Sequence, residues 1–289
     1  MGIIEIKDDI LKNVYKKRDE NARKYDFGSL LVIGGSRLYS GSPLFNALAA
    51  YRAGVDLVTI AAPERAANII ASYSPNIIAY PLEGDYLNKK HLNTLFDLSK
   101  NKTAVVIGGG LCREKSILQT INAYLKKTEI PCVIDADAIY ALAQTKKEFI
   151  ARDFVITPHA YEFFVLTGRQ IGKDLDERID FVRSYAYELQ KVILLKGHVD
   201  VISDGMDVAL NRTGCPYMTK GGMGDTLAGI CGALLARKID SFTAACAAAY
   251  INGKAGELAS NELGESVTAE DLVNFIPKVL KFLIRWIKG

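Results

Sequence analysis

Continuous apolar runs of strand length recur along this chain, and they alternate with segments whose apolar residues have helical spacing. The runs are not broken by polar residues, which is typical of strands buried on both faces of a sheet. This alternation predicts an α/β fold, a three-layer α/β/α sandwich around a mostly parallel sheet. The expected strands are Ser29–Ile33, Leu57–Ala61, Ala104–Ile107, Cys132–Ile134, Phe154–Ile156, Val192–Leu195 and Val199–Ser203.

The segments between these runs carry helix signals. Ser42-Pro43 combines a capping residue with a proline at the first helical position, and it predicts a helix that runs to Ala53 and stops at Gly54. The last expected helix has basic residues within its apolar series, as a membrane-surface helix would, but we expect it to pack on the body or on a neighbouring subunit. The other expected helices are Arg113–Lys127, Asp174–Leu189, Met223–Arg237, Ser241–Ser260 and, last, Ala269–Ile287.

One stretch departs from the parallel pattern. Asp204-Gly205 stands between two short apolar runs within Val199–Leu210, which predicts an antiparallel hairpin. No break in composition, proline-rich linker or repeat divides the chain, so we expect residues 1–289 to form a single domain.

Composition excludes several classes of protein. Hydrophobic residues make up 49% and charged residues 24%, so a packed core is expected. The net charge of +3 argues against a nucleic-acid binder, and no apolar run reaches the roughly 18 residues of a membrane span. Five cysteines without a C-x-x-C spacing and three scattered histidines favour neither disulfides nor a zinc site. With no signal-peptide core at the start, we expect a cytoplasmic protein.

The strongest local signal is the glycine-rich segment that precedes Asp225. Gly221, Gly222 and Gly224 stand directly before a helix of small residues. Glycines let backbone N–H groups approach a ligand, and a helix start adds free donors and a positive dipole end, so the segment suits a phosphate. Asp225 could then take a proton from an attacking hydroxyl. The alternative is a tight turn with Asp225 as a helix cap.

Other polar or glycine-rich segments follow expected strands. Gly34-Gly35-Ser36 and Gly108–Gly110 are turns that would lie at the carboxyl ends of strands, where ligands of parallel sheets bind. Asp135 and Asp137 end a further strand and could contact substrate hydroxyls or a magnesium shell, although for Asp137 we favour capping of the next helix.

Two more strand ends carry candidate groups. His159 and Glu162 follow a strand after Pro158 and should face the same rim, with a structural role for His159 as the alternative. Lys196 and Gly197 follow another strand, where the glycine would let the chain pass close to a base or sugar and the lysine would lie near phosphate; the alternative is a solvated turn.

These motifs, taken in order, resemble a known family. The series Gly35-Ser36, Tyr39-Ser40-Gly41, Asp135-Ala136-Asp137-Ala138, Thr157-Pro158-His159-x-x-Glu162, Leu195-Lys196-Gly197 and Gly222-Met223-Gly224-Asp225 is similar to that of the ADP/ATP-dependent NAD(P)H-hydrate dehydratases of the ribokinase-like superfamily. Many members carry an N-terminal epimerase domain, for which this chain has no room, so the resemblance implies a stand-alone dehydratase unit.

The resemblance implies a reaction. ADP or ATP, with Mg²⁺, would phosphorylate the ring hydroxyl of the S epimer of NADH or NADPH hydrate, and phosphate would leave as the ring double bond re-forms. Small-molecule substrates are thus the expected partners, without nucleic acid or membrane, and a homo-oligomer such as a tetramer is expected.

The resemblance also assigns roles to residues. Asp225 is similar to the catalytic base and substrate contact, and Glu162 to the acid that organises magnesium through water or phosphate. The expected nucleotide-binding residues are Lys196, Gly197, His198, Val199, Asp200 and Gly224. The expected substrate-binding residues are Ser42, Gly110, His159 and Asp225.

Three positions depart from the family pattern. Gly109 stands where proline is usual, Ser42 where alanine is usual, and Met223 where a small or hydroxyl residue is common. Met223 matters little if backbone N–H groups form the anion site. Two alternatives stay open, a ribokinase-like kinase whose phosphorylated product is stable, and a nucleotide-binding module without turnover.

Overall fold

The computed structural model describes residues 2–145 and 153–287, and these form one ten-stranded sheet between two layers of helices. The strands lie in the order β1-β10-β9-β8-β7-β6-β5-β2-β3-β4. Their bounds are β1 Ile3–Glu5, β2 Ser29–Ile33, β3 Leu57–Pro63, β4 Ile78–Leu82, β5 Ala104–Ile107, β6 Cys132–Ile134, β7 Phe154–Ile156, β8 Val192–Leu195, β9 Asp200–Ser203 and β10 Val208–Asn211. Only β9 among them runs antiparallel to its neighbours, so the expected hairpin and the mostly parallel sheet are confirmed.

The continuous apolar runs form strands because each strand feeds two cores. In β2, Leu30 and Val32 belong to one hydrophobic cluster, and Leu31 and Ile33 belong to the other. Successive side chains of a strand point to opposite faces, so a strand covered on both sides needs apolar residues at every position. All five residues of β2 are buried, as this requires.

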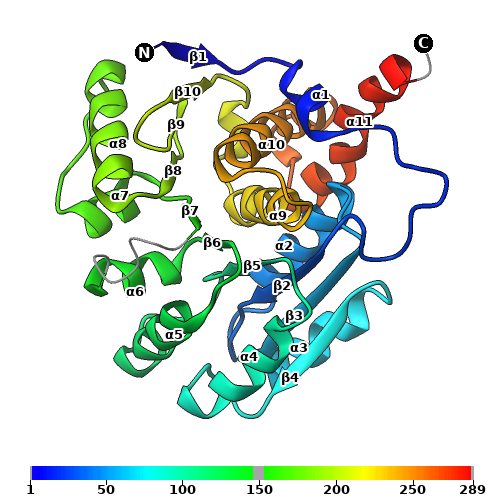
Figure 1. The fold of residues 1–289 in the computed structure, drawn as a ribbon, viewed down its shortest axis with the longest axis vertical. Coiled ribbons are helices and arrows are strands. Elements are labelled where there is room, and N and C mark those ends of the chain that lie inside the picture. The colour runs from blue at the N-terminus through cyan, green and yellow to red at the C-terminus, as the bar shows by residue number, and fades with distance from the viewer. Residues whose placement is uncertain (1, 146–152, 288–289) are drawn as a thin grey trace.

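Helices cover both faces of the sheet, as Figure 1 shows. One layer contains α1 Ile10–Val14, α2 Gly41–Arg52, α3 Glu64–Tyr73, α9 Met223–Ala236, α10 Ser241–Leu263 and α11 Ala269–Ile287. The other contains α4 Leu92–Ser99, α5 Lys115–Lys127, α6 Asp137–Thr145, α7 Ala160–Thr167 and α8 Leu175–Leu189. The three-layer α/β/α sandwich is confirmed.

Some elements were not expected from sequence. These include the edge strands β1, which has only three residues, and β4, in which Ile78 and Tyr80 are exposed and Pro81 interrupts the apolar run. An edge strand tolerates proline because one side of its backbone has no ladder to complete. The short helices α1, α3, α4 and α7 were also missed, since each has few turns over which a period can be read.

The start of α2 differs from the expectation. The helix begins at Gly41 with Ser40 at the capping position, and no side chain caps it. Ser42 lies inside the first turn, so its predicted role as a cap is wrong, and its hydroxyl is left for other partners. The bounds of α11 agree with the expected helix, and it packs against α10 and α2. No helix of the described residues is long and apolar enough to cross a membrane.

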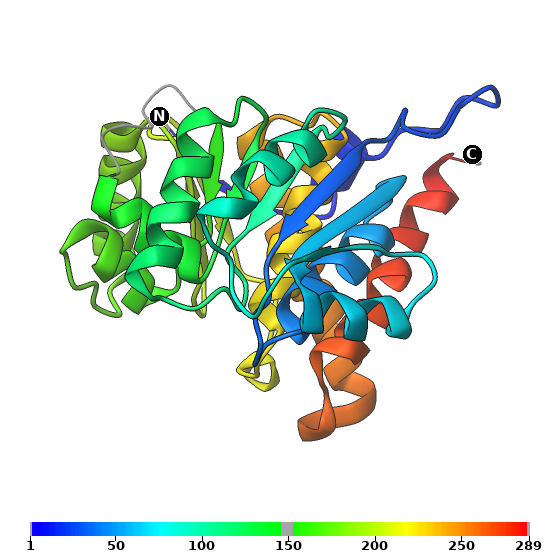
Figure 2. The ribbon, with the colours of Figure 1, turned by 90° about the horizontal axis from the view of Figure 1, so that it is seen from below.

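The order of strands changes direction between β2 and β5. From β2 the chain proceeds to β3 and β4 on one side, whereas β5, β6, β7 and β8 follow on the other. The two glycine turns meet there, since the N–H of Gly35 donates to the carbonyl of Gly109 at 2.8 Å. Ligands of open parallel sheets bind outside the carboxyl ends of strands at such a reversal. Figure 2 shows the loop after β2 and the glycine loop before α9 at the same edge of the molecule.

Candidate functional site

The glycine loop ends in a helix start that is open to a ligand. Gly222 is at the capping position of α9 with φ of 91°, a conformation that favours glycine. A Cβ there would lie 2.7 Å from the Cβ of Ala269, so space forbids a side chain as well. No side chain caps α9. Its first N–H groups are therefore suited to bind an anion.

Asp225 lies in the first turn of α9. The pKa of its carboxyl is raised to about 7, mainly by burial and also by the nearby charge of Asp135, while a hydrogen bond from Ser42 and the charge of Lys196 act in the opposite direction. An acid with a pKa near neutral pH exchanges protons readily under ordinary conditions. The arrangement can therefore remove a proton from a hydroxyl group placed beside Asp225.

The first turn of α9 is held by α2. The side-chain amide of Asn46, which is buried, donates to the backbone carbonyl of Asp225 at 2.7 Å. Met223 is 5% exposed and points into the core, so its side chain takes no part in the open helix start. The departure at Met223 thus leaves the backbone N–H groups of the loop unchanged.

Lys196 stands at the centre of a buried polar network at the ends of β6, β7 and β8. Its Nζ lies 2.9 Å from Asp135 Oδ1 and 3.7 Å from Glu162 Oε2. Burial alone lowers the pKa of Lys196, but the two carboxylates outweigh burial and the pKa is raised. The amine therefore keeps its charge, and it lies 3.4 Å from where a Cβ of Gly224 would be.

Thr157 completes this network, since its hydroxyl donates to Asp135 Oδ1 at 2.7 Å. Asp135 is 4% exposed, so both of these bonds are shielded from water. Charge-assisted hydrogen bonds of this kind hold side chains in one geometry. The charged amine of Lys196 is therefore held in one position next to the open start of α9.

His159 and Glu162 form a reciprocal cap on α7. The Nδ1 of His159 accepts from the N–H groups of Tyr161 and Glu162, at 3.1 and 3.2 Å. Glu162 Oε2 in turn accepts from the His159 N–H at 2.9 Å. Because Nδ1 accepts two bonds, the neutral ring carries its proton on Nε2, which lies 3.5 Å from Glu162 Oε1. The side chain of His159 is half-exposed, that of Glu162 is buried, and both have a structural role at the start of α7.

The segment from Lys196 to Asp200 is braced from inside. Asp200 Oδ1 accepts from the Gly197 N–H and Oδ2 accepts from the Asn211 amide, each at 2.9 Å. Burial raises the pKa of Asp200 to about 6. Its side chain therefore supports the loop, whereas Gly197 and His198 are exposed.

Arg178 covers the outer side of this loop, and sequence reasoning did not identify it. Its guanidinium donates to the Val199 carbonyl at 3.2 Å, and a Cβ on Gly197 would lie 2.3 Å from its Nη2. No local pattern reveals the contact, since Arg178 belongs to α8. A side chain at position 197 would therefore have to displace the end of Arg178 from the loop.

The second glycine loop completes the site. Gly108 has φ of 138°, and a Cβ there would lie 1.8 Å from the Asp135 carbonyl, so only glycine fits. A Cβ on Gly109 would lie 3.0 Å from Asp225 Oδ1, which places this loop beside the acid. Gly110 lies against Tyr39, whose ring is exposed at the rim.

The structure brings most of the expected residues to one place. Asp225, Ser42, Gly224 and Lys196 surround the start of α9, with Gly110 next to Gly109 and with Glu162 and His159 beyond Lys196. Asp137 does not cap α6 with its carboxylate as expected, because that group accepts from the Cys112 N–H and from Arg113. Sequence reasoning also missed Asn46, whose partner is 179 residues away.

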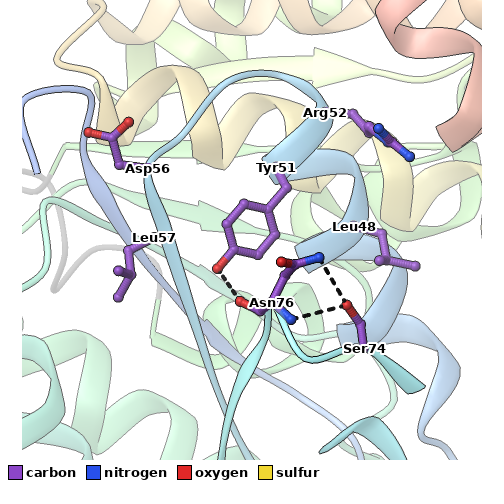
Figure 3. Close-up of a pocket in the computed structure, with 7 residues that line it drawn as sticks. All are labelled: Leu48, Tyr51, Arg52, Asp56, Leu57, Ser74 and Asn76. Carbon is purple, nitrogen blue, oxygen red and sulfur yellow. Dashed lines mark hydrogen bonds between the residues drawn. The ribbon is translucent and has the colours of Figure 1, made fainter. Parts of the chain in front are cut away.

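Two cavities of the molecule lie outside this cluster. One of about 410 Å³ is at the far end of α2, with Tyr51 and Asn76 joined by a hydrogen bond (Figure 3). Since α2 has 12 residues, the cavity is about 18 Å from the helix start near Asp225. A second, of about 470 Å³, is beside Arg65 and Asp85. Neither contains an acid with the properties of Asp225.

The described residues do not form a direct metal site. They contain no group of three or more His, Cys, Asp or Glu side chains that could hold a metal ion. Both oxygens of Glu162 face protein groups, namely the His159 N–H, Lys196 and the His159 ring. The residues present therefore do not fit a metal ion held by protein side chains alone.

Comparison with known proteins identifies relatives of this chain. A family model described as NAD(P)H-hydrate dehydratase (Carb_kinase) matches residues 30–278. The bifunctional NAD(P)H-hydrate repair enzyme Nnr of Pyrobaculum aerophilum is 46% identical over 266 residues, 91% of this chain and 52% of that protein. The chain thus spans about half the length of this relative.

A relative of similar length and a solved structure extend the comparison. The ADP-dependent (S)-NAD(P)H-hydrate dehydratase of Cenarchaeum symbiosum is 38% identical and covers 95% of both chains. The ADP/ATP-dependent NAD(P)H-hydrate dehydratase of Bacillus subtilis, co-crystallized with ATP/Mg²⁺, superposes with a TM-score of 0.85 at 28% identity, over 98% of this chain and 99% of that one. The family model, these relatives and the shared fold agree, and the chain belongs to the NAD(P)H-hydrate dehydratase family.

Proposed function

We propose that this protein is an ADP- or ATP-dependent dehydratase of the S epimer of NADH or NADPH hydrate. The observation that carries the proposal is Asp225, an acid whose pKa is raised to about 7 within the first turn of a helix with open N–H groups. Such a helix start accepts the phosphate of a nucleotide, and the acid accepts the proton of the hydroxyl that attacks it.

The reaction has two stages. First, Asp225 takes the proton of the ring hydroxyl, whose oxygen forms a bond to the terminal phosphorus of the nucleotide while the bond to the nucleotide's bridging oxygen breaks. Second, the phosphate leaves with the electrons of its bond to ring carbon, the neighbouring carbon loses a proton, and the ring double bond re-forms. Phosphorylation is useful because phosphate leaves much more readily than hydroxide.

The other residues have positioning roles in this proposal. Lys196, held by Asp135, would meet the nucleotide phosphate, and the backbone at Gly224 would bind the transferring group. Gly197, His198, Val199 and Asp200 would form the nucleotide segment, with Asp200 as its internal brace. Ser42, Gly110 and His159 would contact the hydrate.

Magnesium would enter with the nucleotide. It would be held by phosphate oxygens and water, and Glu162 would reach it only through water. A homo-oligomer and a cytoplasmic location complete the proposal.

The named activities of the relatives favour this function over a ribokinase-like kinase with a stable product. The test is to incubate the purified protein with (S)-NADH hydrate, MgCl₂ and either ADP or ATP. We expect the absorbance of the reduced-nicotinamide band to return as one phosphate is released for each hydrate consumed. A phosphoester that persists would establish the kinase instead, and nucleotide binding without turnover would establish the binding module.

A further inference from the structure

Arg113 is an exposed cation fixed at the rim of the site. Its Nε donates to Asp137 Oδ1 at 2.7 Å, and its guanidinium lies 3.8 Å from the centre of the Tyr140 ring. The side chain is nevertheless 52% exposed. Among the described residues, no acceptor is recorded for its two terminal amino groups.

The anchor of Arg113 is itself fixed. The second carboxylate oxygen of Asp137 accepts from the Cys112 N–H at 2.9 Å, so both of its oxygens are bonded to the loop that follows β5. Cys112 has φ of 74°, in the left-handed region, so the loop makes a tight turn at this residue. The Nε edge of the guanidinium is therefore bonded to Asp137 and one face packs on Tyr140, whereas the edge with the two terminal amino groups is open to solvent.

Arg113 lies on the side of the site where the substrate is expected. It follows Gly109, which contacts Asp225, by four residues, and four residues of chain span at most about 14 Å. Burial lowers the pKa of Arg113, but Asp137 and, with smaller effects, Tyr140 and Glu162 raise it, so the Glu162 charge on α7 is within electrostatic range of Arg113.

The charges around Arg113 indicate what the open edge of its guanidinium could bind. Asp135, Asp137, Glu162 and Asp225 gather at these strand ends, and the amine of Lys196 is already paired with two of them. A dinucleotide brings a pyrophosphate to this acidic region. Guanidinium groups with a free edge bind phosphate oxygens through two parallel bonds.

We propose that Arg113 binds the pyrophosphate of the dinucleotide substrate, with Asp137 and Tyr140 holding its guanidinium ready. The proposal rests on the dehydratase function proposed above. It gives Asp137 a role as a positioning residue, which explains why its carboxylate points to Arg113 instead of capping α6. It also predicts that binding of the hydrate depends on Arg113, whereas binding of ADP does not.

The test compares Arg113→Met with the parent protein, using NADH hydrate and NADPH hydrate at saturating ADP. We expect KM for both hydrates to rise about ten- to a hundredfold, the scale of lost charge-assisted hydrogen bonds, with kcat and the KM for ADP little changed. Arg113→Lys should restore part of the loss. Salt should raise the parent's KM for hydrate but have little effect on that of Arg113→Met.

Arg169→Met is the matched control. Arg169 is also an exposed arginine near an aromatic ring, 5.4 Å from the centre of Phe181, but it follows the far end of α7. This variant should keep the parent's KM values. An unchanged KM in Arg113→Met overturns the proposal, and a rise confined to NADPH hydrate overturns the pyrophosphate assignment in favour of the 2′-phosphate. Absence of turnover in the parent protein would instead reject the dehydratase function.

Discussion

The two walls of the site differ in what holds them. One wall, at the ends of β6, β7 and β8, consists of charged side chains that already have partners, with Lys196 between Asp135 and Glu162. We call it the paired wall. The other wall, at the ends of β2 and β5 and the start of α9, consists mostly of glycine backbone, and we call it the glycine wall. Paired groups can position a ligand but have few bonds left to give, whereas open N–H groups can bind one directly.

The contrast extends to the acids. Asp135 is bonded to a lysine and a threonine, whereas Asp225 on the glycine wall has its pKa raised to about 7 mainly by burial. Bonds to two side chains hold the Asp135 carboxylate in one position, whereas a buried acid with a pKa near neutral pH can exchange a proton. The comparison thus gives the paired wall a structural role and supports the proposal that the chemistry takes place at the glycine wall.

The largest effect should come from Asp225→Ala. We expect turnover of NADH hydrate to fall by about a hundredfold or more, the scale of a positioned base, while ADP affinity changes little. Steady-state kinetics and equilibrium ADP binding check this. Asp207→Ala, at an exposed turn before β10, is the control and should keep full turnover. Near-normal turnover in Asp225→Ala would remove this residue from the mechanism.

Removal of a charged partner from the paired wall should lower the free energy of unfolding. Lys196→Met leaves Asp135 buried without its cation, so we expect the free energy of unfolding to fall by about 3 kcal/mol or more. Urea denaturation measures this. Lys100→Met breaks an exposed pair, in which both side chains are over 60% exposed, and should cost about 1 kcal/mol or less. Equal losses in the two variants would contradict the contrast between the walls.

The pH dependence of the rate should follow the pKa of Asp225. Because the base must be ionised, we expect kcat/KM for the hydrate to fall about tenfold for each pH unit below about 7. A rate that is constant down to pH 5 would contradict this.

The raised pKa of Asp225 makes the rate increase with pH, but it makes the stability of the fold decrease with pH. Between about pH 4 and pH 7 the folded state holds a proton on Asp225 that the unfolded state has lost, so this group destabilises the fold as pH rises. Asp225→Asn should therefore be more stable than the parent protein at pH 8, measured by urea denaturation.

The smallest effect should come from Ser42→Ala. The hydroxyl of Ser42 lowers the pKa of Asp225, so its removal should move the acidic limb of the pH–rate profile to higher pH by less than about one unit. Because the change is on the glycine wall, we expect the urea midpoint to change little. A shift to lower pH would mean that Ser42 has another role.

Local patterns predicted the centre of the sheet and the neighbourhood of the site. The central strands were found because they are apolar at every position, and the site because polar or glycine residues follow strands whose carboxyl ends must meet. Edge strand β4 was missed because half of its environment is solvent. Its exposed residues obey no period that a buried strand would show.

The pairings inside the site could not be predicted. Lys196 and Asp135 are 61 residues apart. Which acid pairs with this lysine depends on which strands lie next to each other in the folded sheet. For the same reason Lys196 was expected at a nucleotide phosphate, without its carboxylate partners. Asp137 was expected to cap a helix, since nothing local shows that Arg113 would bind it instead.

The bond between the Asn46 amide and the Asp225 carbonyl has a consequence for biosynthesis. It joins residues 179 positions apart, and Asp225 follows β10, which ends at Asn211. All ten strands are thus translated before the acid emerges from the ribosome. A nascent chain could assemble its sheet and still lack Asp225, so the proposed chemistry begins only after the last strand has been made.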